Sequence, residues 1–333
     1  MVCLKYIATA DLRRQQKNTL MLSLLICNLV AAAYCSAQFK DELPAECEQS
    51  DEDKFAETNA TERRLVERQL AEASINLEDC GAAEFRDWQT KQRSYSCARQ
   101  TRETHNATRQ LARNRYSAGY YPKRSEIPSW VRLYPHGTGG QRCSGTIIAH
   151  NLVVTAEHCL TSYDDKVSVT VGFQRHTAAK ICRASRDIAI IRLKTSFEFG
   201  DSVKAACVEL YRRPARGSVC LGVGNGMRDK RVSSQGPVRA LPLTQVECDK
   251  LSKADVRCYE SALNYNGGIC SGDSGGPVYC FESCKGKTRM FVTGVGCLGG
   301  LPCTPGRKTY TAYCDFVNER EKFIRALKEC SSD

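Results

Sequence analysis

Three short segments carry residues that could act together on a carbonyl group. Ser274 lies in the segment 270–277 (CSGDSGGP), where glycines on both sides predict a sharp bend that exposes the hydroxyl. A serine hydroxyl is a poor nucleophile until a neighbouring base takes its proton. His158, within TAEHC, could be that base, and Asp187, within RDIAIIRL, could orient it. The three residues together suit nucleophilic attack on a carbonyl carbon.

The order His, Asp, Ser and the residues that flank each of them resemble the chymotrypsin/trypsin family of serine endopeptidases. The resemblance covers roughly residues 116–330, about two-thirds of the chain. It implies that Ser274 attacks the scissile carbonyl, that His158 takes and returns the proton, and that Asp187 holds the imidazole tautomer. It also implies an oxyanion hole made by the backbone N–H groups of Gly272 and Ser274. Glycine suits position 272 because this loop needs a backbone conformation that side chains disfavour.

The elements that must position these residues read as strands. Short β-branched and apolar runs, separated by Gly, Pro and Asn, begin near residue 116 and include 146–148, 152–155, 167–171 and 290–293. This pattern predicts an all-β barrel or sandwich, and the resemblance implies two six-stranded antiparallel β-barrels. Only the tail, 316–330, predicts an α-helix; its apolar side would hold Phe316, Phe323, Ile324 and Leu327.

The resemblance also implies disulfide pairs. They are Cys143–Cys159, Cys220–Cys280, Cys248–Cys258 and Cys270–Cys303, together with a bridge from Cys207 to Cys97 that would tether a cleaved prosegment. Neither the sequence nor the resemblance assigns partners to Cys182, Cys284, Cys297, Cys314 and Cys330.

Two departures from the family pattern affect the expected substrate cleft. Only 29 residues separate His158 from Asp187, so a surface loop has been shortened. The segment 296–299 (GCLG) stands where the family normally has Ser-Trp-Gly, which pairs with the substrate backbone. Leu298 and Gly299 are therefore expected to line a different pocket wall.

Three outcomes remain open for the residue that precedes the cleaved bond. Gly268 stands six residues before Ser274, where trypsin-like members place an aspartate, so basic side chains lose their counter-charge. Gly268 and Ile269 would suit small aliphatic side chains. Counting back from Tyr310 puts Lys308 on the back wall of the pocket, as in granzyme-like members that cleave after acidic residues. The segment that contains Lys308 is one residue shorter than usual, and a slip of the register by one residue would leave Lys308 in solvent instead. We expect an acidic or small aliphatic preference.

The resemblance implies synthesis as a zymogen. Family spacing places the new N-terminus at Tyr116, so that a trypsin-like activating protease would cleave after Arg115. The freed ammonium would then pair with Asp273 and shape the oxyanion hole. Gly119 fits the family's usual Ile-Val-Gly-Gly start, whereas Tyr116 does not. A solvated, arginine-rich linker is the alternative interpretation of this stretch.

The composition indicates a secreted protein. The chain has 333 residues and 20 cysteines, and it contains no Cys-x-x-Cys pair, which disfavours both a reducing compartment and a zinc site. Residues 1–37 have basic residues before an apolar run and end in small residues, as a cleaved signal peptide does. The alternative is a type II signal-anchor, because the apolar run of 18 residues could just span a membrane.

Residues 38–115 read as a prosegment that is partly helical or disordered, and residues 116–333 as the protease domain. Asn59 and Asn106 each begin an Asn-Ala-Thr sequon, so both are expected to carry glycans. The net charge of +11 belongs wholly to the protease domain, with 31 Lys/Arg against 20 Asp/Glu. A solvated basic surface is the simpler explanation, and attraction to acidic glycans or acidic substrates is the alternative.

The sequence therefore predicts a secreted serine endopeptidase with protein or peptide substrates. An activating protease and protein inhibitors are further expected partners, while no motif supports nucleic-acid binding and no metal or organic cofactor is implied. A membrane-anchored protease and a catalytically silent, protease-like binding protein are the alternatives.

Overall fold

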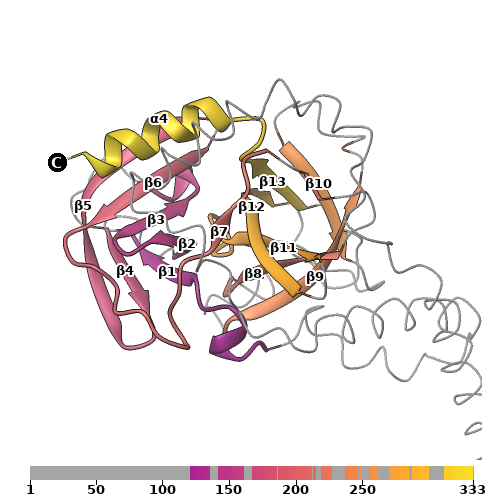
Figure 1. Cartoon of the computed structure of the whole chain (residues 1–333), viewed down its shortest axis with the longest axis horizontal. Helices are drawn as coiled ribbons and strands as arrows, with labels where there is room; N and C mark the ends of the chain where they lie inside the picture. The colour runs from indigo at the N-terminus through magenta and orange to yellow at the C-terminus, as the bar shows by residue number, and fades with distance from the viewer. Residues whose placement is uncertain are drawn as a thin grey trace, which may run out of the picture.

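The computed structural model (Figure 1) shows two β-barrels side by side, with one α-helix at the C-terminal end. The residues that the structure describes are 121–135, 142–160, 167–185, 187–211, 213–214, 219–226, 237–246, 248, 256–261, 270–284, 287–299 and 311–332. The predicted fold class, two six-stranded antiparallel barrels and a C-terminal helix, is confirmed.

The first barrel is a closed ring of six strands in the order β1-β2-β3-β6-β5-β4, all antiparallel. The strands are β1 (Trp130–Tyr134), β2 (Cys143–Ala149), β3 (Leu152–Thr155), β4 (Ser168–Val171), β5 (Gln174–Ser185) and β6 (Ile188–Leu193). Its interior is filled by β-branched and leucine side chains, including Val131, Leu133, Val153 and Ile191, which are fully buried. The apolar runs in the sequence therefore form these strands because their side chains fill a closed barrel.

The second barrel closes where β11 pairs with β12. Its strands are β8 (Val219–Gly224), β9 (Arg239–Val246), β10 (Val256–Ser261), β11 (Pro277–Cys284), β12 (Lys287–Gly299) and β13 (Thr311–Asp315). The two-residue strand β7 (Cys207–Val208) adds a parallel edge to β12. A shared apolar cluster contains residues of both barrels, such as Ile190 and Val292, so the barrels pack on each other.

Helix α4 (Arg320–Ser331) lies over β5 and β6 of the first barrel (Figure 1). Its buried face holds Phe323, Ile324 and Leu327, as the sequence predicts. The predicted start at residue 316 is wrong, because Phe316 lies in the turn before the helix and packs against Phe323 from there. No helix in the described part of the chain has the length and hydropathy needed to cross a membrane.

Three of the predicted disulfides are present: Cys143–Cys159, Cys220–Cys280 and Cys248–Cys258. Two of the cysteines left without a partner join β5 to α4 as Cys182–Cys330, and two more join β12 to β13 as Cys297–Cys314. Cys207 and Cys270 are also disulfide-bonded. The partners predicted for them, Cys97 and Cys303, lie outside the described residues.

Candidate active site

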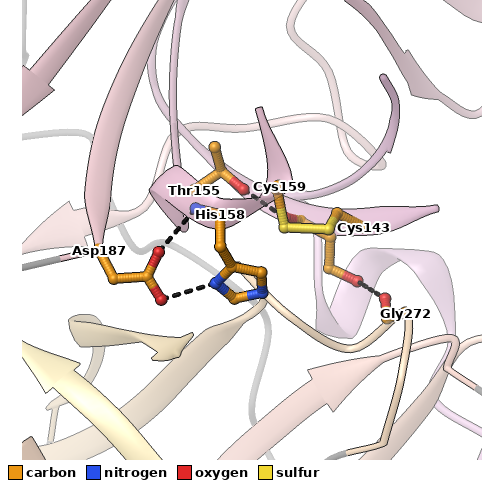
Figure 2. Close-up of a disulfide and its surroundings, with 7 residues drawn as sticks. Cys143, Thr155, His158, Cys159, Asp187 and Gly272 are labelled. Carbon is orange, nitrogen blue, oxygen red and sulfur yellow. Dashed lines mark hydrogen bonds and ion pairs between the residues drawn. A yellow bond between two sulfur atoms is a disulfide. The ribbon is translucent and has the colours of Figure 1, made fainter. Parts of the chain in front are cut away.

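His158 follows directly from strand β3 of the first barrel. The chain leaves β3 at Thr155 and makes one turn of 3-10 helix, Glu157–Cys159. The disulfide Cys143–Cys159 joins this turn to the start of β2. The His158 side chain projects from this turn and is exposed to solvent (Figure 2).

Asp187 lies in the short connection between β5 and β6, next to His158 (Figure 2). Its φ angle is +73°, and it is the one non-glycine residue with a positive φ in the described part of the chain. The connection from Ser185 to Ile188 is therefore a tight one. This sparsely populated conformation aims the carboxylate at His158.

Two contacts hold His158 and Asp187 together. The backbone N–H of His158 donates to Asp187 Oδ1 over 2.7 Å, and His158 Nδ1 lies 2.6 Å from Asp187 Oδ2. A carboxylate at Nδ1 favours the tautomer that carries hydrogen there. The Nε2 lone pair of the neutral ring is then available to accept a proton, which is the arrangement that a general base needs.

The loop that carries Ser274 is bound to the first barrel through Ser144. The Ser144 N–H donates to the Ser274 carbonyl over 2.8 Å, and the Ser144 hydroxyl donates to the Gly272 carbonyl over 3.2 Å. The Thr155 hydroxyl in turn donates to the Ser144 carbonyl over 2.8 Å. Ser274 is therefore held against the same strand ends that lead to His158.

Gly275 makes this close packing feasible. Its φ angle is +75°, and a Cβ built there would lie 2.1 Å from Thr155 Oγ1 and 2.4 Å from the Ser144 carbonyl oxygen. On the other side, the Gly275 N–H donates to the Gly296 carbonyl over 2.7 Å. The loop thus lies between both barrels, and no side chain fits at position 275.

Gly272 has the conformation that the sequence predicts, with a φ angle of +100°. Within the described part of the chain, neither the Gly272 N–H nor the Ser274 N–H donates a backbone hydrogen bond. Free N–H groups on both sides of one residue can converge on an anionic oxygen.

The Asp273 side chain points away from this site into a cradle of glycines. Its Oδ1 accepts from the Gly226 N–H over 2.6 Å, and its Oδ2 accepts from the Cys270 N–H over 3.0 Å. A Cβ on Gly224 would lie 2.1 Å from the carboxylate. Desolvation raises the pKa of Asp273 above its ordinary value, against the two backbone N–H groups and the more distant Arg239, which lower it.

The structure describes the expected substrate cleft only in part. Leu298 and Gly299 end strand β12, where Gly299 lies opposite the buried Thr311 of β13. Gly268, Ile269 and Lys308 lie outside the described residues, as do the activation residues Arg115 and Tyr116, the sequons of Asn59 and Asn106, and the signal segment.

Sequence reasoning missed the residues that support the three candidates. Thr155 and Gly275 lie within the motifs and Ser144 lies beside Cys143, but nothing in their type indicates that they contact one another. An ion pair between Glu157 and Arg183, with Oε1 and Nε 2.9 Å apart, was missed for the same reason. The charge of Glu157, inside the TAEHC segment, is the one signal that could have prompted a search for a partner.

One group of residues in the described part of the chain has the proximity of metal ligands, namely Asp187, Cys297 and Cys314. The two cysteines are joined in a disulfide, so their sulfurs cannot serve as thiolate ligands. The donor set in this oxidised form therefore does not suit a metal ion.

A family model described as "Trypsin" matches residues 118–318. The alpha- and beta-fibrinogenase OhS1 of Ophiophagus hannah is 26% identical over 251 residues, which cover 66% of this chain and 91% of the relative. Serine protease 1 of Rattus norvegicus is 29% identical over 62% of this chain and 89% of its own length. Trypsin alpha of Drosophila melanogaster is 30% identical over 42% of this chain and 64% of its own length.

Proposed function

Since the chain belongs to the trypsin family and is a serine endopeptidase, we propose that it cleaves peptide bonds through His158, Asp187 and Ser274. The observation that carries this assignment is the two-contact bond between His158 and Asp187, which leaves Nε2 of the neutral ring as the basic nitrogen. Ser274 Oγ attacks the scissile carbonyl, while His158 takes its proton and later gives it to the leaving amine.

The oxyanion of the tetrahedral intermediate is bound by the backbone N–H groups of Gly272 and Ser274. Their freedom from other backbone partners in the described chain supports this role. Losing one such donor costs about 3 kcal/mol of transition-state stabilisation.

Labelling with a fluorophosphonate probe tests the assignment. The activated wild type is expected to react at Ser274, and peptide mapping identifies the modified residue. Ser274→Ala should remove the label, and His158→Ala should slow it strongly because the base is gone. A folded wild type that is not labelled, or a label on another serine, contradicts the assignment and favours a silent, protease-like binding protein.

Cleavage after Arg115 is proposed to switch the enzyme on. Desolvation raises the pKa of Asp273 although Arg239 lowers it, and this balance supports a role for a further cation beside the carboxylate. An ammonium freed at Tyr116 would supply one and would hold the loop from Gly272 to Ser274 in the oxyanion-binding form. N-terminal sequencing of the activated enzyme should begin at Tyr116; a start at Ser125 would refute the site.

The proposed preference before the cleaved bond is an acidic or small aliphatic residue. It is supported by Gly268, which replaces an acidic pocket floor, and by Lys308, which the family register places at the back wall. A peptide-library cleavage profile of the wild type beside Lys308→Ala separates the two cases. An acidic preference that depends on Lys308 supports the first, and a small aliphatic preference in both enzymes supports the second. A dominant Arg/Lys preference contradicts both.

Secretion as a glycoprotein completes the proposal. The curated relatives with this domain include proteases named as snake venom enzymes, which supports an extracellular role. Expression in a secreting cell should give a protein that starts near Gln38 and loses mass on removal of N-linked glycans. Asn59→Gln and Asn106→Gln should each remove one glycan. An intact leader would instead favour a membrane-anchored form.

A further inference from the structure

The disulfide Cys297–Cys314 lies against the carboxylate of Asp187. Each sulfur is within 4.8 Å of an Asp187 carboxylate oxygen, and both cysteines are buried. Asp187 belongs to the first barrel, whereas the two cysteines join β12 to β13 of the second barrel. The disulfide is thus a point at which the second barrel closely approaches the carboxylate that orients His158.

Cys297 is also the extra residue of a β-bulge. Gly296 lies opposite Tyr313 and Leu298 lies opposite Ala312, so that no residue of β13 lies opposite Cys297. A bulge breaks the ladder and redirects the side chain of the inserted residue. The bond to Cys314 fixes this redirected side chain to the neighbouring strand.

The residue just before the bulge, Gly296, is hydrogen-bonded to the loop that carries Ser274. Gly296 accepts from the Gly275 N–H over 2.7 Å and donates to the Gly276 carbonyl over 2.8 Å. Gly275 and Gly276 directly follow Ser274. One cross-link therefore restrains both the contact surface of Asp187 and the backbone segment that anchors the nucleophile loop.

A disulfide also sets the chemistry of that contact, because it has no hydrogen to donate. Within the described chain, the hydrogen bonds to the Asp187 carboxylate come from His158. Cys297 stands in the segment 296–299, where the family normally has Ser-Trp-Gly, and a serine there would offer a hydroxyl to a neighbouring acceptor. In this chain a covalent bond between β12 and β13 takes the place of that hydroxyl.

We propose that Cys297–Cys314 is a positioning disulfide, which holds Asp187 and the Ser274 loop in their relative places for catalysis. The proposal rests on the proposed function of His158, Asp187 and Ser274. Neither cysteine acts on the substrate. Loss of the bond should lower the reactivity of Ser274 while the fold persists.

The rate of fluorophosphonate labelling at Ser274 provides the test, since it does not depend on substrate preference. Cys297→Ala with Cys314→Ala should slow labelling by about 10²-fold, the scale of a misplacement of about 1 Å. Peptide hydrolysis should lose kcat with little change in KM. The matched control is Cys248→Ala with Cys258→Ala, which removes a disulfide of similar span, 10 residues against 17, and should keep the labelling rate within about twofold.

A rescuing substitution separates the positioning role from a simple loss of stability. Cys297→Ser with Cys314→Ala leaves the bond absent but offers Asp187 a hydroxyl donor, so labelling should return to within about tenfold of the wild type. The strongly deshielded proton NMR signal of the bond between His158 Nδ1 and Asp187 should weaken in the double alanine variant. The same signal should persist in the Cys248/Cys258 control.

Each outcome bears on one proposal. A folded double alanine variant that is labelled at the wild-type rate overturns the positioning role and leaves the proposed function intact. A wild type that is never labelled at Ser274 overturns the proposed function itself. If the double alanine variant does not fold, graded reduction of the folded wild type decides. Labelling should fall as reduction opens Cys297–Cys314, which alkylation of a separate aliquot reports, and it should recover when the sample that was not alkylated is reoxidised. Full reactivity with both thiols reduced overturns the role.

Discussion

Glu157 Oε1 lies 2.9 Å from Arg183 Nε, so the residue before His158 is bound to the strand that leads to Asp187. The two side chains are 38% and 44% exposed, which places the pair at the surface, where ion pairs contribute little. The pair is a second link between the two segments that the direct bond between His158 and Asp187 already joins. We therefore expect the pair to assist the alignment of His158 and Asp187 without being required for it.

A double-mutant cycle with Glu157→Ala and Arg183→Ala should measure a coupling of about 0.2–1 kcal/mol in the free energy of unfolding. Labelling of Ser274 should change by no more than a few-fold in any of the three variants. The coupling should decrease at high salt, because exposed charges are screened. A loss of labelling similar to that of His158→Ala would show that the pair is essential.

Replacement of three glycines by alanine would distinguish the cost of a strained backbone from the cost of a steric clash. Gly275 has a positive φ and no room for a Cβ, Gly172 has a positive φ of +54° with nothing within 4 Å, and Gly200 has open space around it. Gly172→Ala should cost about 1–2 kcal/mol of stability, the usual cost of a left-handed alanine. Gly200→Ala should stay within about 1 kcal/mol of the wild type.

Gly275→Ala should be much worse than either control, because its Cβ would meet the Ser144 carbonyl and the Ala156 nitrogen, which are backbone atoms. We expect a loss of roughly 3 kcal/mol or more in thermal or denaturant unfolding, together with loss of labelling at Ser274. Equal losses for Gly275→Ala and Gly172→Ala would show that the loop can move away from the first barrel.

The apolar runs, such as 152–155 and 290–293, predicted an all-β barrel or sandwich, and the family resemblance narrowed this to two six-stranded barrels. The sequence predicted the candidate triad because the flanks of Ser274, His158 and Asp187 are distinctive. It could not pair Cys182 with Cys330, since disulfide partners depend on tertiary proximity and many pairings are compatible with one cysteine count.

The helix start and the support of the Ser274 loop also needed tertiary information. Phe316 is apolar at a helical spacing from Phe323, yet it fills the core from a turn. The role of Ser144 depends on the approach of a segment about 130 residues away, which no local pattern reports.

The pH dependence of stability should reveal the ionisation of Asp273 in the uncleaved chain. Burial raises the pKa of Asp273 in the folded state above its ordinary value of 3.8. The folded state therefore holds the proton more tightly than the unfolded state, so stability falls as the pH rises from about 3.8 through the raised value. Asp273→Asn has no proton to lose and should lack this component.

The measurement is the midpoint of thermal unfolding at a series of pH values for the wild type and Asp273→Asn. The unfolding midpoint of Asp273→Asn should rise relative to that of the wild type as the pH rises through this window. Cleavage after Arg115 should reduce the difference, since the new ammonium would stabilise the ionised carboxylate. Parallel curves across the whole window would show that Asp273 does not titrate in this way.

Replacement of Ser274 and His158 should show that the two residues act as one unit. Ser274→Ala and His158→Ala should each lower peptide hydrolysis by a factor on the order of 10⁴ or more, and the double variant should be no worse than either single one. The reason is that each residue works only through the other, so the second loss removes nothing further. Thermal unfolding of Ser274→Ala should stay close to the wild type, because the hydroxyl contributes little to packing. Multiplicative losses in the double variant would mean that His158 and Ser274 act independently, and substantial hydrolysis by Ser274→Ala would end the assignment.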